Sequence, residues 1–503
     1  MPVTTSKRPP STNTWSRPGR SITLLAAAAL GSVLVGAAPE GTRLAAVVAV
    51  FNLAIIAFLL NRYIRGSPLL NAPLIAFLPG LGVSWPVTML FFSSFHPDAA
   101  YLNEAGATSF LAGAIRYQLC LSLFLVAYSA AILLTERSAD FAPPLSGGRI
   151  TSLEWRLALF GITTSVTGAF AALPGLPEWS TFVLNGLRNF GYPLILFAGL
   201  FWTSLSTSRR TEVIVGLLVQ GGVNTLGNSR GQALLPAALF AIGLLFSPGI
   251  RKRTKAWLIV ASVMLFPFYL VLANQSRLVL GNLGLGNADE RVKVLRDASQ
   301  GTVVYENGGV LLDAATRLFL SGGQAIVNGR WDHAALSDFD PAAFIIETGR
   351  AMLPSYVFGR PAHSEYLGSD SLRQYGFTIS DSTSVEVSLV GSLFGWGGLG
   401  LVFIGGLVTG LVHRLTLHGI IATGRDHRAA MVAGLSGMAS ATLWAWNLDL
   451  GSHLRALVWS LIYIALVVLA FRVLGVLWPA PITLRRRPAR PPGMSDFCRF
   501  DHD

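Results

Sequence analysis

Long apolar runs separated by short polar connections dominate the hydrophobic pattern of this chain. Runs of about 18 to 25 residues are typical of membrane-spanning helices. The pattern predicts twelve spans, near residues 21–38, 43–61, 69–92, 110–134, 155–173, 181–203, 211–225, 230–247, 256–274, 384–413, 429–446 and 454–477. The tenth run is too long for one crossing, and its FGWGGLG sequence at 394–400 predicts a short helix followed by a full crossing. We therefore expect an all-α polytopic membrane protein.

The composition agrees with this class. Of the 503 residues, 52% are hydrophobic and only 13% are charged, and the mean hydropathy is +0.54. Soluble domains contain roughly 25% charged residues, so this chain lacks the polar side chains needed to cover a soluble domain of its length. The two cysteines, Cys120 and Cys498, offer no disulfide framework, and the eight histidines show no metal-ligand spacing. No metal or other cofactor is predicted.

The net charge of +12 is concentrated at the chain ends and in short turns, such as IRKRTK at 250–255 and LRRRPAR at 484–490. Such clusters orient membrane proteins and contact anionic lipid, so we do not expect nucleic-acid binding. With the N-terminus inside, the positive connections all fall on the cytoplasmic side, while HPDAAYLNEAG, PGLPEW, LGNS and NLDLGSH fall outside. We expect a multi-pass protein of the cytoplasmic membrane with both termini inside and a retained first helix.

One connection, residues 275–383, is far longer than the rest and is predicted to lie outside. It contains amphipathic stretches such as PAAFIIETGRAMLPSYV and too many large apolar residues for a disordered linker. We expect a small folded cap, and long ordered loops often carry function. The predicted organisation is an N-terminal tail, spans one to nine, the cap, spans ten to twelve and a basic tail, at residues 1–20, 21–274, 275–383, 384–477 and 478–503.

Four arginines are predicted at the outer level of the spans. Arg230 begins the eighth span and Arg277 ends the ninth, whereas Arg116 and Arg188 lie about 9 and 10 Å inside the fourth and sixth. A charged arginine in a bilayer costs about 2.5 to 3.5 kcal/mol, so the two deeper residues are predicted to face a polar cavity. Guanidinium groups bind phosphate oxygens in a bidentate manner, which favours a diphosphate ligand. Arg230 and Arg277 have the alternative of reaching lipid head groups.

Two motifs carry a resemblance to a known family. In DSTSVEVSLVGSLFGWGGLGLVFIGGLVTGLVHR, at 381–414, Glu386 precedes an apolar helix, an aromatic and glycine-rich break and a second helix rich in small residues. This segment resembles the late part of bacterial oligosaccharide repeat-unit polymerases, the Wzy-type O-antigen polymerase group. NSRG at 228–231, followed by a leucine-rich helix, resembles a feature in the middle of those chains. The resemblance carries over Arg230 and Glu386 as matched positions and implies a GT-C-like bundle of about twelve helices.

The resemblance also implies a function. Such an enzyme transfers the growing glycan from its polyprenyl (undecaprenyl) diphosphate to a sugar hydroxyl of an incoming lipid-linked repeat unit, on the outer face of the membrane. Products of this kind include O-antigen, capsule and exopolysaccharide, and the expected partners include a chain-length regulator and a flippase. Arginines can stabilise the leaving diphosphate without a metal, and the acceptor hydroxyl needs a general base or an orienting acceptor.

Glu386 is the first candidate for that base, because it lies where the external connection meets the membrane. Its alternative role is that of a carboxylate at a helix N-terminus, where it offsets the helix dipole. His363, in GRPAHSEY, is the second candidate, with an ordinary surface histidine as the alternative. Arg350 and Arg360 bracket AMLPSYVFG, where they either clamp a phosphate or pair with nearby glutamates, Glu347 and Glu365.

Three aromatic residues of the same connection are candidate stacking surfaces for sugar rings, with ordinary packing as the alternative for each: Trp331, Tyr356 and Tyr366. Three other functions also fit the pattern: a flippase or transporter for lipid-linked oligosaccharide, an O-antigen-ligase-like transferase, and a non-catalytic membrane scaffold. Transporters often consist of repeated halves and open to both faces. The absence of an internal repeat and the outer position of the deep arginines favour an enzyme that works on one face.

Overall fold

The structure is a computed structural model in which every described element is a helix. It describes residues 43–65, 70–82, 107–135, 152–172, 176–226, 230–247, 250–251, 253–258, 261, 327, 331, 339–352, 388–423, 428–443, 445 and 448–477. The α-helices are α2 (Arg43–Arg65), α3 (Ala72–Gly82), α6 (Ala107–Leu134), α7 (Ser152–Ala169), α8 (Glu178–Gly191), α9 (Ile195–Leu200), α10 (Thr207–Leu226), α11 (Arg230–Phe246), α16 (Pro341–Met352), α19 (Leu389–Thr423), α20 (Arg428–Leu443) and α21 (Leu450–Leu477). Three short 3-10 helices are η3 (Phe170–Ala172), η4 (Tyr192–Leu194) and η5 (Trp202–Ser204).

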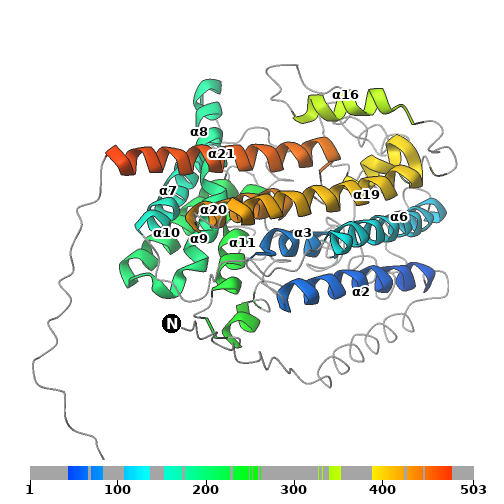
Figure 1. Ribbon diagram of the computed structural model, residues 1–503, viewed down its shortest axis with the longest axis horizontal. Coiled ribbons are helices and arrows are strands. Elements are labelled where there is room, and N and C mark those ends of the chain that lie inside the picture. The colour runs from blue at the N-terminus through cyan, green and yellow to red at the C-terminus, as the bar shows by residue number, and fades with distance from the viewer. Residues whose placement is uncertain are drawn as a thin grey trace, which may run out of the picture.

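Four of these helices are long and apolar enough to cross a membrane. The segments are Ala46–Ile64, Ile115–Leu134, Leu389–Ala422 and Leu450–Val473, which lie in α2, α6, α19 and α21. They correspond to the second, fourth, tenth and twelfth predicted spans, and they run along the long axis of Figure 1. The described part of the chain is therefore all-helical and compatible with a membrane protein, and the full set of twelve spans stays a prediction.

The tenth predicted span has the break that its glycines indicated. Gly397 and Gly398 of α19 leave helical geometry, and Gly398 has a φ of 62°, a conformation that glycine adopts without steric penalty. A short helix therefore precedes a long one, as predicted. The long helix continues to Thr423, ten residues beyond the predicted end at residue 413.

The sixth predicted span, 181–203, is not one straight helix. It consists of α8, η4 and α9, with Pro193 inside η4. Proline has no backbone N–H to donate and its ring disfavours a continuous α-helix, which accounts for the change of helix type at this point. The third predicted span, 69–92, is described only as the 11-residue helix α3, which contains Pro79.

Helices α6 and α19 pack in parallel through a surface of small residues. A Cβ atom added to Gly406 would lie 2.7 Å from the carbonyl oxygen of Phe124, and one added to Gly410 would lie 2.8 Å from that of Tyr128. Small residues four positions apart allow such close backbone approach between membrane helices. The two helices correspond to even-numbered predicted spans, which are expected to run in the same direction.

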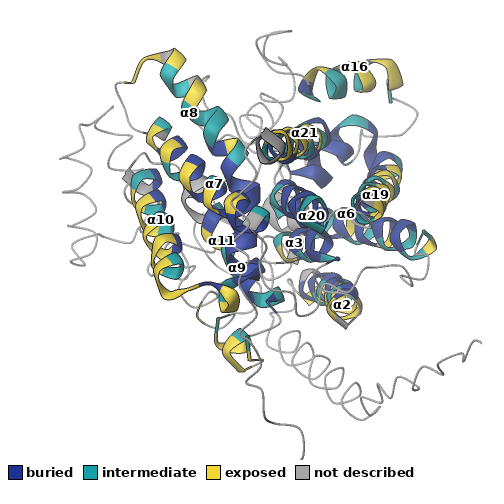
Figure 2. Ribbon diagram, turned by 60° about the vertical axis from the view of Figure 1, so that its left-hand side comes forward, coloured by how far each residue is buried: buried dark blue, intermediate teal, exposed yellow. Residues whose placement is uncertain are grey.

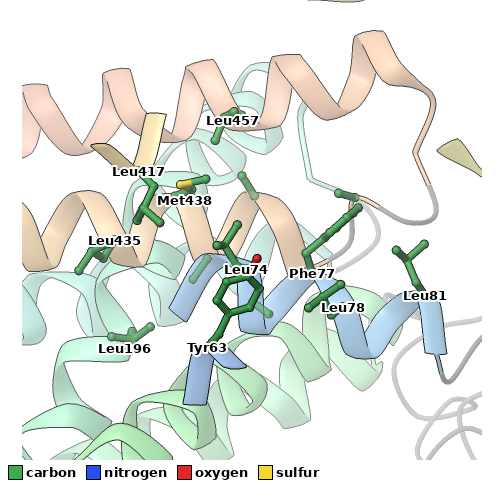
Figure 3. Packing of buried hydrophobic residues seen from close by; sticks show 14 of the residues in the cluster. Tyr63, Leu74, Phe77, Leu78, Leu81, Leu196, Leu417, Leu435, Met438 and Leu457 are labelled. Atoms are coloured by element: carbon green, nitrogen blue, oxygen red, sulfur yellow. The ribbon is translucent and has the colours of Figure 1, made fainter. Parts of the chain in front are cut away.

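The centre of the bundle is formed by α3 and α20, which carry mostly buried residues in Figure 2. Leu74 and Phe77 of α3 pack there with Leu435 and Met438 of α20, and Leu457 contributes from α21 (Figure 3). All five side chains are at most 2% exposed. This core holds the surrounding helices at fixed positions relative to one another.

The described part of the long external connection packs against α19 and α21. Helix α16 begins near the break of α19, where Phe344 contacts Trp396 with ring centroids 5.7 Å apart. At its other end, Met352 accepts a hydrogen bond of 3.1 Å from Trp459 Nε1 of α21. In Figure 1, α16 lies beside the first turns of α21. The helix predicted from PAAFIIETGRAM is thus present and docked.

Contacts also join connections that were predicted to be cytoplasmic. Arg428, at the start of α20, pairs with Glu154 in the first turn of α7 at 3.1 Å. Arg209, at the start of α10, stacks over the ring of Trp155 at 4.6 Å. Ends predicted for one face of the membrane therefore meet in the fold.

Candidate functional site

The candidate site is built around Arg188, which is only 7% exposed although it lies on an amphipathic helix. Its position follows from close antiparallel packing of α8 on α7. A Cβ atom added to Gly168 would lie 2.5 Å from the backbone nitrogen of Arg188, and one added to Gly191 would lie 2.5 Å from the carbonyl oxygen of Gly161. The missing side chains of these glycines allow α8 to approach so closely that Arg188 is enclosed.

One neighbour of this guanidinium is Tyr192, which belongs to a group of neutral polar side chains. Arg188 Cζ lies 5.9 Å over the ring of Tyr192, whose side chain hydrogen-bonds with those of Gln220 and Asn224. Gln220 Nε2 donates to Ser165 Oγ, and Asn224 Nδ2 donates to the carbonyl oxygen of Gln220 at 3.0 Å. We call these five residues from α7, α8, η4 and α10 the Arg188 cluster. It is a polar region inside an apolar helix bundle.

The Arg188 cluster lies far from the predicted cytoplasmic end of α7. Gly168, which faces Arg188, is 14 residues beyond Glu154, or about 21 Å along the helix axis. Helix α10 runs in the same direction as α7, with Arg209 beside Trp155 at one end and Gln220 beside Ser165 towards the other. The cluster is therefore near the ends of α7 and α10 that are predicted to face outside.

Arg230 belongs to the same end of the bundle. It is the first residue of α11, six residues after Asn224, and α11 packs against Tyr192 through Leu235 and Leu239. The side chain of Arg230 lies outside the described residues. The fold thus brings the beginning of α11 close to the Arg188 cluster, as expected if both arginines serve one ligand.

Arg116 has a different environment, at the outer end of α6. Its Cζ lies 5.3 Å over the ring of Trp331, which stacks on Phe394 of α19 at 5.6 Å and an interplanar angle of 11°. Arg116 therefore contacts the external connection directly. The ring of Trp331 is occupied by protein groups, which favours ordinary packing over sugar stacking for this residue.

Glu386 lies outside the described residues, but its neighbour Ser388 is placed. The Ser388 side chain is 2.9 Å from the Tyr117 hydroxyl of α6 and accepts the backbone N–H of Gly391. Ser388, with a φ of 57°, is thus the N-cap of α19, the role considered as an alternative for Glu386.

Arg350 is on the exposed side of α16 and pairs with Glu347 at 3.0 Å, with 54% of its side chain exposed. This agrees with the pairing alternative for Arg350. Within the described residues, the partners of Arg116, Arg188 and Arg350 differ, so their guanidinium groups belong to separate regions. The remaining predicted site residues lie outside the described part: Arg277, Arg360 and His363, together with the candidate stacking residues Tyr356 and Tyr366.

Sequence reasoning missed the polar partners of Arg188. Gln220 and Asn224 interrupt the apolar run VIVGLLVQGGVNTL at a spacing of four residues, which places both on one face of α10. That spacing could have indicated a polar face on α10. The sequence around Tyr192 did not indicate its role, because a tyrosine next to a proline is equally consistent with a kink in the apolar core.

Searches against protein-family models, curated proteins and solved structures found no match to this chain. The choice of a function therefore depends on the residues and contacts described above.

Proposed function

We propose that this chain is a glycosyltransferase of the cytoplasmic membrane that polymerises polyprenyl-diphosphate-linked oligosaccharide repeat units on the outer face. The observation that carries the proposal is the burial of Arg188 among polar side chains at the predicted outer ends of α7 and α10. Ionisable residues inside apolar helix bundles are rare and mark substrate or ion sites. An arginine at this position suits a lipid-linked diphosphate, since its planar fork matches phosphate oxygens.

In the proposed mechanism, Arg188 and Arg230 bind the diphosphate leaving group. As the glycosidic bond to the diphosphate breaks, negative charge grows on the leaving oxygen, and fixed guanidinium groups stabilise that charge. Tyr192 contacts Arg188 and is itself held by hydrogen bonds with Gln220 and Asn224, which keeps the arginine in place. Such pre-organisation is what distinguishes stabilisation of a transition state from simple attraction of an anion.

Glu386 is assigned as the base that accepts the proton of the acceptor hydroxyl. In the sequence it precedes by two positions Ser388, whose side chain is within hydrogen-bond distance of Tyr117 on α6. A carboxylate there accepts the hydroxyl proton as the sugar oxygen attacks the donor carbon. Arg116 contributes by holding the external connection at Trp331. Arginines supply the positive charge that the leaving group needs, so the proposed reaction requires no metal.

A gene deletion in the source bacterium, complemented with variants, tests the proposal. Loss of the polymerase leaves single repeat units on the cell surface, loss of a flippase leaves no surface sugar, and loss of a ligase leaves unattached long chains. Arg188→Ala and Glu386→Gln are expected to reproduce the first phenotype while the protein still accumulates in the membrane. Normal glycan ladders from both variants would remove this assignment.

A further inference from the structure

A buried hydrogen-bonded chain of three side chains lies outside the candidate site. Tyr128 of α6 is 3.1 Å from Nδ1 of His413 on α19, and Nε2 of His413 is 2.8 Å from Nε2 of His453 on α21. The three side chains are 0%, 0% and 1% exposed. Three helices that are distant in sequence thus contribute one polar group each to a continuous chain.

Among the described residues, the donors and acceptors of these three side chains leave one ring nitrogen, His453 Nδ1, without a hydrogen-bond partner. A neutral imidazole has one N–H and one lone pair, so either His413 donates to His453 or His453 donates to His413. In the first case His453 Nδ1 carries a hydrogen, and in the second it carries a lone pair. Among the described residues, His453 Nδ1 is buried and has no hydrogen-bond partner in either case. A buried ring nitrogen without a partner is destabilising, because it has lost its hydrogen bonds to water.

The groups around the chain are mostly aromatic. Phe77 of α3 lies edge-on to His413 at 5.1 Å and parallel to His453 at 6.3 Å, and Phe124 stacks on Tyr128. The titratable and charged groups facing it are few. Tyr63 of α2 interacts with Tyr128. The backbone oxygen of Asp449 accepts the N–H of His453, and its Oδ1 caps α21 at Ser452. In the sequence, Arg414 directly follows His413 and Arg455 is two residues after His453.

We propose that Tyr128, His413 and His453 form a proton-binding relay whose terminal atom, His453 Nδ1 near the start of α21, takes up and releases a proton. The incoming proton bonds to the Nδ1 lone pair. The hydrogen on Nε2 of His453 then moves to Nε2 of His413. One proton is taken up and one positive charge is gained, which rests on His413 with its Nδ1–H directed at the Tyr128 oxygen. Histidine chains inside membrane bundles are used in this way in pumps and transporters.

The position of the relay gives the proton a structural consequence. His453 is two residues after Gly451, and a Cβ atom added to Gly451 would lie 2.6 Å from that of Ala351 in α16. The atom that takes up the proton is therefore on the first turns of α21, close in sequence to the point where α16 docks, and the charge comes to rest on His413 of α19. This inference holds whether the chain transfers or translocates its lipid-linked substrate, because it concerns residues outside the Arg188 cluster.

Nitrogen NMR of the full chain in lipid nanodiscs, labelled with ¹⁵N at histidine, tests the relay. Signals are assigned by single His→Gln variants, and the sample is titrated from about pH 8 to about pH 3. The ring nitrogens of His413 and His453 are expected to change together in one step that corresponds to one proton. The His453→Gln substitution should abolish the step at His413. Unchanged signals throughout the range, or two independent steps, would overturn the proposal.

His418 provides the matched control, because it is exposed on the same helix as His413. His418→Gln should leave the joint step intact. If His453→Gln does not accumulate, Tyr128→Phe removes only the hydroxyl and keeps the ring stacked on Phe124. The relay then predicts a changed balance between Nδ1–H and Nε2–H forms at His413, whereas an unaltered balance contradicts it.

Discussion

The interface of α7, α8 and α10 and the interface of α6 and α19 use similar packing for different purposes. Both bring backbones together through glycine, at Gly168 and Gly191 in the first and at Gly406 and Gly410 in the second. The first interface encloses Arg188 with polar side chains. The second is lined mostly by aromatic and apolar residues, with the Tyr128–His413 hydrogen bond buried in it, and its arginine, Arg116, stacks on a tryptophan.

This difference shows that the predicted depth of an arginine in the membrane does not define its role. Arg116 and Arg188 were predicted at nearly the same level, yet one has a tryptophan of the external connection as its neighbour and the other has tyrosine and amide groups. A guanidinium on an aromatic ring fixes two protein segments to each other. A guanidinium among fixed dipoles is prepared for an anion. Substitutions that separate these two roles are the direct test.

The largest effect is expected at Arg188. Arg188→Lys keeps a positive charge but loses the bidentate fork, and chain elongation should fall by about 10²- to 10³-fold, as when one pre-organised donor is removed. The measurement is conversion of lipid-linked repeat units in purified membranes. Arg209→Lys, at the opposite end of the same helix group, is the matched control and should leave the rate near that of the wild type. Equal loss in both variants would break the comparison.

The next effect concerns the packing surface of α6 and α19. Gly410→Leu forces a side chain against the backbone of Tyr128 and the Cβ of Ala131, and overpacking of this kind costs about 1 to 3 kcal/mol of unfolding free energy. Gly419→Leu on the same helix is the control, since a Cβ there meets nothing within 4 Å. Unfolding in detergent measures the difference. Equal stability of the two variants would mean that these helices are not in backbone contact.

A smaller effect is expected for Arg116→Gln, which removes the stacking on Trp331. Interactions of a cation with an aromatic ring contribute about 0.5 to 2 kcal/mol, so the external connection should detach more often while the enzyme retains most of its activity. Hydrogen exchange at the backbone of Trp331 should become faster. A loss of elongation as large as that of Arg188→Lys would instead place Arg116 on the diphosphate.

The smallest effect is expected for Arg350→Gln. Its ion pair with Glu347 is exposed, and such pairs contribute less than about 1 kcal/mol. Thermal unfolding and chain elongation should both remain close to wild type. Strong loss of elongation would show that Arg350 binds substrate rather than its neighbour on α16.

The fold was predictable where the signal lay within one segment. The break at Gly397 and Gly398 could be located from FGWGGLG, because a helix with consecutive glycines loses its conformational preference. The bounds of α11 agree with the predicted eighth span to within one residue. The division of the sixth predicted span was missed because the length of the apolar run outweighed Pro193, although proline within a run is a known signal for a kink.

The candidate site was predictable only in part, since its neighbours come from different helices. That Arg188 faces the protein interior was predictable from its place in an apolar run. Its contact with Tyr192 is local, but Ser165 and Gln220 meet only through the parallel packing of α7 and α10. The pairing of His413 with His453 likewise joins α19 to α21. The periodicity within one helix identifies which of its faces is buried. It does not identify which face of another helix packs against it.

The ion pair between Glu154 and Arg428 has a consequence for biogenesis. The two residues are 274 positions apart, and the Glu154 side chain is 1% exposed in the finished fold. At a synthesis rate of about 5 to 20 residues per second, Arg428 is made roughly 14 to 55 s after Glu154. Until Arg428 has been made, the contact between the start of α7 and the start of α20 cannot form. Completion of the bundle therefore waits for the last third of the chain, and a nascent protein truncated before α20 would lack this contact.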